Sequence, residues 1–211
     1  MRNGRMWAAV QRRIGRRLGL TRRDRDERGA VLVEAAIVIP ILMMITLGII
    51  EYGGAYRENA AVAGAARAGA RVASSLPKTD FGCASACSAD SAATVAAAVS
   101  SALQSFGANA PQQLWIYKAG TGNAAPFTGC TNCVGYNWDP TSKSFTGPQL
   151  GPGWAAANQG ACASGPPDQI GIYIKVNHKA VTSMFGGDRT LTATTIMRLE
   201  PYVGTLPCAA A

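Results

Sequence analysis

The feature that most constrains this chain is an apolar run that begins at Ala30 and ends at Ile50. No charged residue lies between Ala35 and Ile50, and the whole run has roughly the 20 residues with which a helix crosses the hydrocarbon core of a bilayer. The sequence therefore predicts one membrane-spanning helix over residues 30–51. Pro40 removes one backbone hydrogen bond inside this helix, so a bend or local loosening is expected there.

The segment before the apolar run is strongly basic. Residues 1–28 hold ten arginines and three acidic residues, which accounts for +7 of the formal net charge of +8. A basic arm with Trp7 is compatible with nucleic acid, but no recognisable DNA- or RNA-binding module accompanies it. Directly before a span, such an arm is typical of the positive-inside rule. We therefore expect residues 1–29 to form a cytoplasmic leader, residues from about Glu51 onward to lie outside the cytoplasm, and nucleic acid not to be a partner.

A cleaved secretory signal is the competing interpretation of this region. The apolar part of such a signal is usually about 7–15 residues long and is followed closely by a small-residue cleavage site. The run in this chain is longer, and Glu51-Tyr52 follows it instead of an Ala-x-Ala pattern. We therefore expect the helix to remain in the mature protein as a single membrane span.

The helix is expected to continue beyond the membrane. Residues 55–73 are rich in alanine, the best helix former, so the sequence predicts an extension over residues 52–76 that stays helical to about Ser74 and ends before Pro77. Small residues recur at helical spacing within it, namely Ala60, Gly64 and Ala68. They allow another helix to approach closely, or they belong to a helix that packs on its own domain, and both interpretations stay open.

Glu34 is the one charged residue inside the apolar run. A carboxylate at depth in a membrane costs on the order of 2–3 kcal/mol or more, so its presence requires a reason. Glu34 either marks the start of the helix in the headgroup region, where a negative charge suits the positive end of the helix dipole, or it has a functional role.

Three stretches of the chain resemble the TadE family of pilin-like proteins. They are Arg28–Glu34 with Pro40, the exit Gly48–Gly53, and the Ala-Ala-Arg-Ala-Gly-Ala-Arg stretch that ends at Arg71; residues 191–201 also resemble the closing strand of that family. The resemblance implies a minor pilin or pseudopilin that takes part in assembly, priming or capping of a tight-adherence (type IVb) pilus, with a pilin-like fold.

The resemblance also assigns roles to residues at the start of the apolar run. It implies that a prepilin peptidase cuts after Gly29, so that the mature chain begins at Ala30, and glycine leaves the scissile bond open to the enzyme. It implies further that Glu34 meets the amino group of a neighbouring subunit's first residue. The expected partners are the lipid bilayer, the prepilin peptidase, other pilin-like subunits and the pilus assembly platform.

The expected fold class is α+β, in which the long helix continues into a small extracytoplasmic domain over residues 77–211. A second helix is predicted over residues 88–106, because Val95, Val99, Leu103 and Phe106 form one apolar stripe. The rest is expected to be a small antiparallel sheet, with strands over residues 114–118, 170–176 and 189–203, a short helical or turn element at 180–185 and loops with a poorly aligned hairpin over 119–167.

Six cysteines follow the span: Cys83, Cys87, Cys130, Cys133, Cys162 and Cys208. Their even number on the exterior side predicts disulfides, of which 15 pairings are possible; two short local bridges with Cys162 joined to Cys208 form one plausible set. The alternatives are a zinc site on the first four cysteines and a redox-active pair at Cys130 and Cys133. We expect neither, and no metal.

No catalytic constellation is recognisable in the sequence. His178 is expected at a surface or strand end, and Asp168, Asp188 and Glu200 are isolated carboxylates, so we expect neither an enzyme nor a cofactor. The alternative function is a membrane-anchored extracellular binding or adhesion domain that is not incorporated in a pilus. In that case Trp115, Trp138 and Trp154 would offer aromatic contacts to a sugar or protein.

The orientation of the span is testable. A reporter enzyme that is active only outside the cytoplasm, fused after Ala211, should be active, because the arginine-rich arm keeps the N-terminal side in the cytoplasm. The measurement is reporter activity in intact cells, compared with a second fusion to a reporter that works only in the cytoplasm. Activity of the cytoplasmic reporter alone would contradict the predicted orientation.

Overall fold

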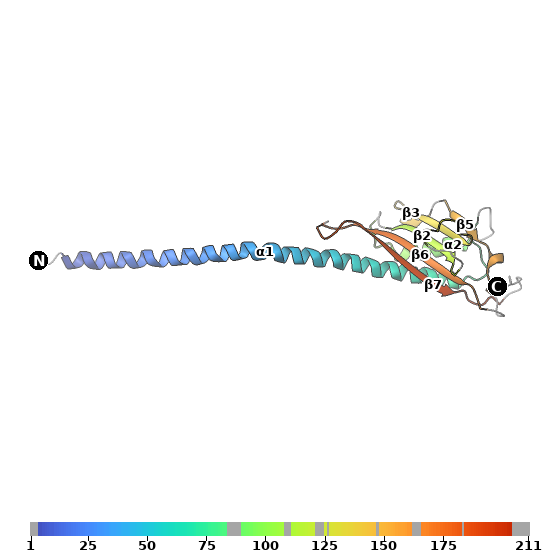
Figure 1. The fold of residues 1–211 in the computed structure, drawn as a ribbon, viewed down its shortest axis with the longest axis horizontal. Coiled ribbons are helices and arrows are strands. Elements are labelled where there is room, and N and C mark those ends of the chain that lie inside the picture. Colours follow the sequence, from blue (N-terminus) through green and yellow to red (C-terminus); the bar gives the residue numbers. More distant parts are fainter. Residues whose placement is uncertain are drawn as a thin grey trace. The chain divides into compact units, whose positions relative to one another are not determined.

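The computed structural model describes residues 4–83, 90–107, 111–120, 125, 127–146, 148–161, 166–182 and 184–203, with side chains from residue 29 onward except that of Cys83. It has the expected α+β class, with two α-helices and an antiparallel sheet (Figure 1). In chain order the elements are α1 (Gly4–Ser74), β1 (Phe81–Cys83), α2 (Ser91–Ala102), β2 (Pro111–Lys118), β3 (Cys133–Asp139), β4 (Ser144–Phe145), β5 (Leu150–Trp154), the 3₁₀-helix η1 (Ala156–Asn158), β6 (Gln169–His178) and β7 (Arg189–Arg198).

The chain divides into two compact units, Met1–Ile50 and Glu51–Ala211, and helix α1 has residues in both. The helix continues through Pro40 without ending, and its end at Ser74 is as expected. It begins at Gly4, however, well before the predicted start at Ala30, so the leader is part of the same helix. Within the first unit, the large apolar side chains from Val31 to Ile50 are 44–71 % exposed, except that Leu47 is half-buried. Among the described residues, this is the one stretch long and apolar enough to cross a membrane, and no part of it is buried by the protein. Such a surface fits a lipid environment, as expected for a single-pass membrane protein.

The second unit is built around a sheet whose strands pair antiparallel. Along the main path the strand order is β1-β5-β3-β2-β6-β7, and β4 pairs with β3 alone. The longest pairing joins β6 to β7 without interruption, from Gln169 opposite Arg198 to His178 opposite Arg189. The strong apolar alternation predicted over residues 170–176 is thus confirmed as β6. The strand predicted over 189–203 is β7, which ends earlier, at Arg198.

Residues 119–167 are more ordered than the expected loops with a poorly aligned hairpin, because β3, β4, β5 and η1 lie within this region. The antiparallel pairing of β3 with β4, and that of β3 with β5 with its register shift, correspond to the expected hairpin. The glycines of this region were interpreted as loop residues, although some occupy strand positions that have no room for a side chain. Gly135 of β3 lies opposite Trp115 of β2, and a Cβ atom on Gly135 would lie 2.7 Å from the Trp115 ring. The glycine therefore accommodates the indole across the strand pair.

Two further elements differ from the expectation in length. Helix α2 is shorter than the predicted 88–106, because Asp90 caps it and accepts a hydrogen bond from the Ala92 amide. The strand predicted over 114–118 begins earlier, at Pro111. The described residues of 180–185 form bends and a turn, which agrees with the turn alternative of the element expected there.

Asp90 also fixes the start of α2 to the sheet. Its carboxylate accepts hydrogen bonds from the Gly82 amide at 2.9 Å and from the Tyr136 hydroxyl at 3.1 Å. Burial, reinforced by the adjacent Asp90 charge and this hydrogen bond, raises the pKa of Tyr136 well above its usual range. One side chain therefore joins α2, β1 and β3.

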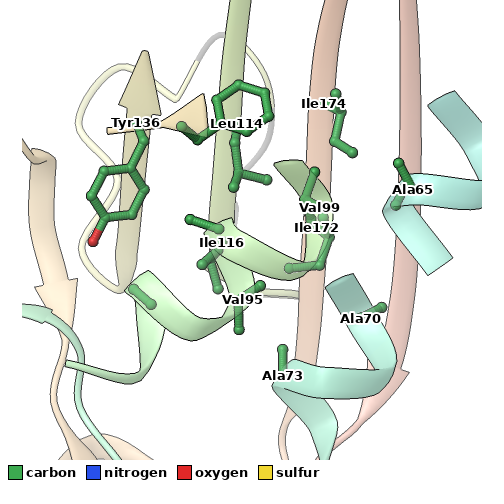
Figure 2. Close-up of a cluster of buried hydrophobic side chains, with 14 of the residues drawn as sticks. Ala65, Ala70, Ala73, Val95, Val99, Leu114, Ile116, Tyr136, Ile172 and Ile174 are labelled. Carbon is green, nitrogen blue, oxygen red and sulfur yellow. The ribbon is translucent and has the colours of Figure 1, made fainter. Parts of the chain in front are cut away.

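The main core lies between one face of the sheet and both helices. Figure 2 shows Ala65, Ala70 and Ala73 of α1 in the same cluster as side chains of α2 and of strands β2, β3 and β6. The predicted apolar stripe of α2 is completely or almost completely buried in this cluster, which confirms its role. Because α1 contributes mainly alanines to the core, its backbone can approach α2 closely.

This close approach leaves no room for a side chain at one glycine of α1. A Cβ atom on Gly69 would lie 2.5 Å from Cγ2 of Val99, so we expect Gly69→Ala to destabilise the fold by about 1–3 kcal/mol through overpacking. Gly64 on the same helix has open space around its Cβ position, so Gly64→Ala should be neutral or stabilise by up to about 1 kcal/mol. Thermal unfolding of the full chain in detergent measures both. Equal effects of the two substitutions would contradict the described packing.

Candidate functional site

The residues predicted to take part in processing and assembly lie on an exposed part of α1. The Gly29–Ala30 bond is inside the continuous helix, and a Cβ atom on Gly29 would have no neighbour within 4 Å. Glu34 is exposed, and no described side chain of the same chain pairs with it. Packing within the chain therefore explains neither the glycine nor the glutamate.

A cluster of charged side chains and backbone amides lies where α1 meets the connection between β6 and β7. We call it the helix–hairpin junction, and it consists of Glu51, Glu58, His178, Val181 and Thr182. Glu51 and Glu58 are seven residues apart, so they project from the same face of α1. His178 is the last residue of β6, and Val181 and Thr182 follow it in the hairpin. The junction lies entirely within the second unit.

The carboxylate of Glu51 is held by backbone amides. Oε2 accepts a hydrogen bond from the Val181 amide at 2.9 Å and one from the Thr182 amide at 3.2 Å, and Oε1 accepts from the Val181 amide at 3.1 Å. Glu51 is only 7 % exposed. Hydrogen bonds from amides to a charged carboxylate are among the stronger ones in proteins, so they offset part of the cost of burying this charge.

His178 connects the second glutamate to the hairpin. Its Nδ1 lies 2.8 Å from Oε2 of Glu58, and its Nε2 lies 3.9 Å from Oε1 of Glu51, beyond hydrogen-bond distance. Of the two expected places for His178, the strand end is confirmed, because this residue ends β6, but the surface is not, since His178 is only 4 % exposed. Nε2 is buried without a hydrogen-bond partner among the described residues. The imidazole therefore lies between two carboxylates that both come from α1.

The spaces beside the junction are small. A cavity of about 10 Å³ is lined by Glu51, Tyr52, His178 and Arg189, together with Ala55, Phe185, Gly186 and Gly187. This volume is about that of one water molecule. A more open hollow nearby, which Arg57, Glu58 and Phe106 help to line, holds about 180 Å³ and is smaller than the roughly 300–1,000 Å³ of usual ligand pockets. Neither space suits an organic ligand.

The junction also does not have the donor set of a metal site. Glu51 already accepts hydrogen bonds on both oxygens, and its Oε1 is 3.9 Å from Nε2 of His178. No group of three or more metal-ligating side chains is placed to hold an ion within the described part of the chain. The arrangement is that of a clamp, in which α1 holds the base of the β6–β7 hairpin through Glu51 and Glu58.

The sequence did not identify the junction, although a weak signal was present. Glu51 follows the apolar run directly and Glu58 lies two helical turns later, which places two carboxylates on one face. The sequence did not show the partners of these carboxylates, because the hairpin residues that contact them are 120 or more residues away along the chain. The interpretation of Asp168 as isolated was also wrong. Its Oδ2 lies 2.8 Å from Nζ of Lys118 and accepts from the Gly160 amide at 2.7 Å.

The cysteines are resolved in part. Cys130 and Cys133 form a disulfide, which confirms one predicted bridge and leaves neither sulfur as a thiolate for zinc. The bridge lies beside a cluster on the outer face of the sheet, in which Phe127 stacks on Trp115 at 4.8 Å between ring centroids. The side chain of Cys83 and all of Cys87, Cys162 and Cys208 lie outside the described residues, so their pairing stays a prediction.

The tryptophans do not form the aromatic surface required by the alternative function. Trp154 is completely buried in the main core, and Trp115 is 8 % exposed beneath Phe127. Trp138 is partly buried and packs edge-on against Phe145 at 5.0 Å. At least two of the three rings are thus held in the interior and stabilise the fold.

Comparison with known proteins gives one match. Residues 29–71 match the family of TadE-like proteins, and the matched range contains Gly29, Ala30, Glu34, Glu51 and Glu58. No curated protein and no solved structure matches the chain. The match therefore covers the apolar run and most of its helical extension, and it includes the α1 half of the junction.

The clamp at the junction is testable through the hairpin amides. Glu51→Ala removes the acceptor of the Val181 and Thr182 amides, which is expected to cost about 1.5–3 kcal/mol locally. Hydrogen exchange at these two amides should accelerate by roughly ten- to a hundred-fold. Glu200→Ala, which changes an exposed carboxylate elsewhere in the chain, serves as the control. Unchanged exchange in Glu51→Ala would contradict the clamp.

Proposed function

We propose that this chain, whose residues 29–71 match the family of TadE-like proteins, acts as a minor pilin or pseudopilin in the assembly of a tight-adherence pilus. The proposed role is structural, as a subunit that assembles, primes or caps the pilus. The observation that carries the proposal is the exposed apolar helix with an unpaired Glu34 near its start.

The apolar surface of α1 is consistent with the proposal that the subunit moves from the lipid bilayer into a protein assembly. Side chains from Val31 to Ile50 are exposed all around the helix and not on one face only. A helix that is apolar all round is buried in a membrane or in a large protein assembly. In the proposed cycle the lipid covers this surface first, and the helices of neighbouring subunits cover it in the pilus.

Gly29 supports cleavage after this residue. A buried glycine often makes room for a neighbouring group, but the position of a Cβ atom at Gly29 is open. Glycine also weakens a helix by roughly 0.5–1 kcal/mol relative to alanine, which favours local opening of the backbone. A peptidase needs an accessible, non-helical backbone at the scissile bond. Both properties suit a processing site between Gly29 and Ala30.

Glu34 supports pairing with a neighbour. Removal of residues 1–29 creates an amino group at Ala30, and the charge of Glu34 has no described partner in its own chain. An unpaired carboxylate in the apolar region is costly, and a cation from another subunit lowers this cost. The pair would form only when two subunits are correctly aligned, so it would favour one register of assembly.

Processing is tested by sequencing the N-terminus of the protein from cells that express a prepilin peptidase. We expect Ala-Val-Leu-Val-Glu, and we expect Gly29→Val to block cleavage because a branched side chain hinders the scissile bond. Gly29→Ala, with a much smaller side chain, is the matched control for folding. Retention of Met1 in the wild-type chain would contradict cleavage.

Assembly is tested in the same cells by recovery of the subunit in sheared pili or in the pilus base. Glu34→Leu should insert into the membrane as well as the wild type or better, since it removes a costly charge, but it should be recovered with pili several-fold less often. Glu200→Leu removes an exposed carboxylate outside the span and should assemble normally. Normal assembly of Glu34→Leu together with an uncut N-terminus would overturn the proposed function.

A further inference from the structure

The hairpin between β6 and β7 presents apolar side chains away from the protein. We call residues 179–188 the hairpin tip, and the structure describes all of them except residue 183. Val181 is 70 % exposed and Met184 is 61 % exposed. Within the second unit, neither side chain belongs to the two described apolar clusters. The tip thus exposes two large apolar groups on a short turn.

The junction fixes the height of this tip along α1. The amide of Val181 donates to Glu51, and Glu51 is the residue that directly follows the apolar run. The run from Ala30 to Ile50 has 21 residues, or about 32 Å of helix, which matches the roughly 30 Å hydrocarbon core of a bilayer. The backbone of the tip is therefore held to Glu51, the residue at which the predicted span ends.

The residues around the tip have the chemistry of a membrane–water interface. Lys179 is the first residue of the tip and Arg189 directly follows the tip; both are exposed, and long cationic side chains at a membrane surface reach lipid phosphates. Arg189 lies over the ring of Tyr52, with 5.4 Å between Cζ and the ring centroid. Tyr52 is 53 % exposed and Tyr56 is 77 % exposed. Tyrosines with nearby cations are enriched where a membrane protein meets the headgroups.

We propose that the hairpin tip is a second membrane contact of this protein, in which Val181 and Met184 insert into the outer boundary of the bilayer. Lys179 and Arg189 hold phospholipid phosphates, and the carboxylate of Glu51 keeps its hydrogen bonds from the hairpin amides in place of water. The domain is thereby docked on the lipid surface at two places, the helix and the tip. The inference rests on the membrane span and is independent of the pilus role.

A photo-crosslinking experiment tests this contact on the full chain in phospholipid nanodiscs. The photoreactive residue p-benzoyl-phenylalanine replaces Met184 in one variant and Ala157 in a control. Ala157 is exposed, and the carbonyl of its neighbour Ala156 accepts a hydrogen bond from Lys78, which lies just beyond the C-terminal end of α1. Because Glu51 and the end of α1 are separated by about 35 Å of helix, Ala157 lies far from the hairpin tip. A third variant carries the photoreactive residue at Ile45, inside the span.

Mass spectrometry of the crosslinked chain gives the outcome. We expect phospholipid adducts at positions 45 and 184, with the yield at 184 several-fold above that at 157. Adducts at 45 with equal yields at 184 and 157 would overturn the tip contact while leaving the span intact, and so would crosslinks from 184 to a second copy of the protein. Absence of adducts at 45 would overturn the span itself, and the tip contact with it.

Discussion

The fold depends on the close packing of a small-residue face of α1 against α2 and β6. Ala65, Ala66, Ala70 and Ala73 are almost completely buried, and Gly69 lies close to both Val99 and Ile172. This face lets one continuous helix serve two environments. Over residues 30–50 large apolar side chains point in all directions, whereas over residues 62–73 only one face is apolar enough to be buried and the other carries Arg67 and Arg71. The change in composition determines where the lipid-facing part ends and the domain begins.

Glu34, near the start of the apolar run, and Glu51, directly after the run, differ in whether their carboxylates have hydrogen-bond partners within the described part of the chain. Glu51 receives three hydrogen bonds from the hairpin amides and is buried by its own domain. Glu34 has no described partner in the chain and is exposed. Both positions are costly for a carboxylate near hydrocarbon, yet only one of the two costs is offset within the subunit. The remaining cost at Glu34 is a reason to expect an interaction with another molecule, whereas Glu51 contributes to the stability of the monomer.

The sequence predicted the elements that rest on local periodicity. The apolar run, the end of α1 at Ser74, the buried stripe of α2 and the alternation of β6 were all confirmed, because each is encoded within one segment. What it could not predict depends on contacts across the chain. The strands between residues 119 and 167 are short and rich in glycine, and Gly135 is a strand residue only because Trp115 covers it from β2. The partner of His178 is likewise unpredictable, since Glu51 and Glu58 lie more than 110 residues earlier.

The distribution of charge connects processing with the behaviour of the mature subunit. Cleavage after Gly29 would remove +7 of the formal +8 and leave side-chain charges that sum to +1, so the mature protein would have almost no net attraction to anionic lipid. Its adhesion to the membrane would then depend on apolar area and on a few local cations such as Lys179 and Arg189. Such contacts are readily exchanged, because apolar side chains that leave lipid can be covered by the apolar helices of neighbouring subunits at little net cost. A subunit with a strongly basic mature domain would lose favourable electrostatic contacts on leaving an anionic membrane. A nearly neutral subunit would not, which would favour its entry into the proposed assembly, in which Glu34 would pair with a neighbouring subunit.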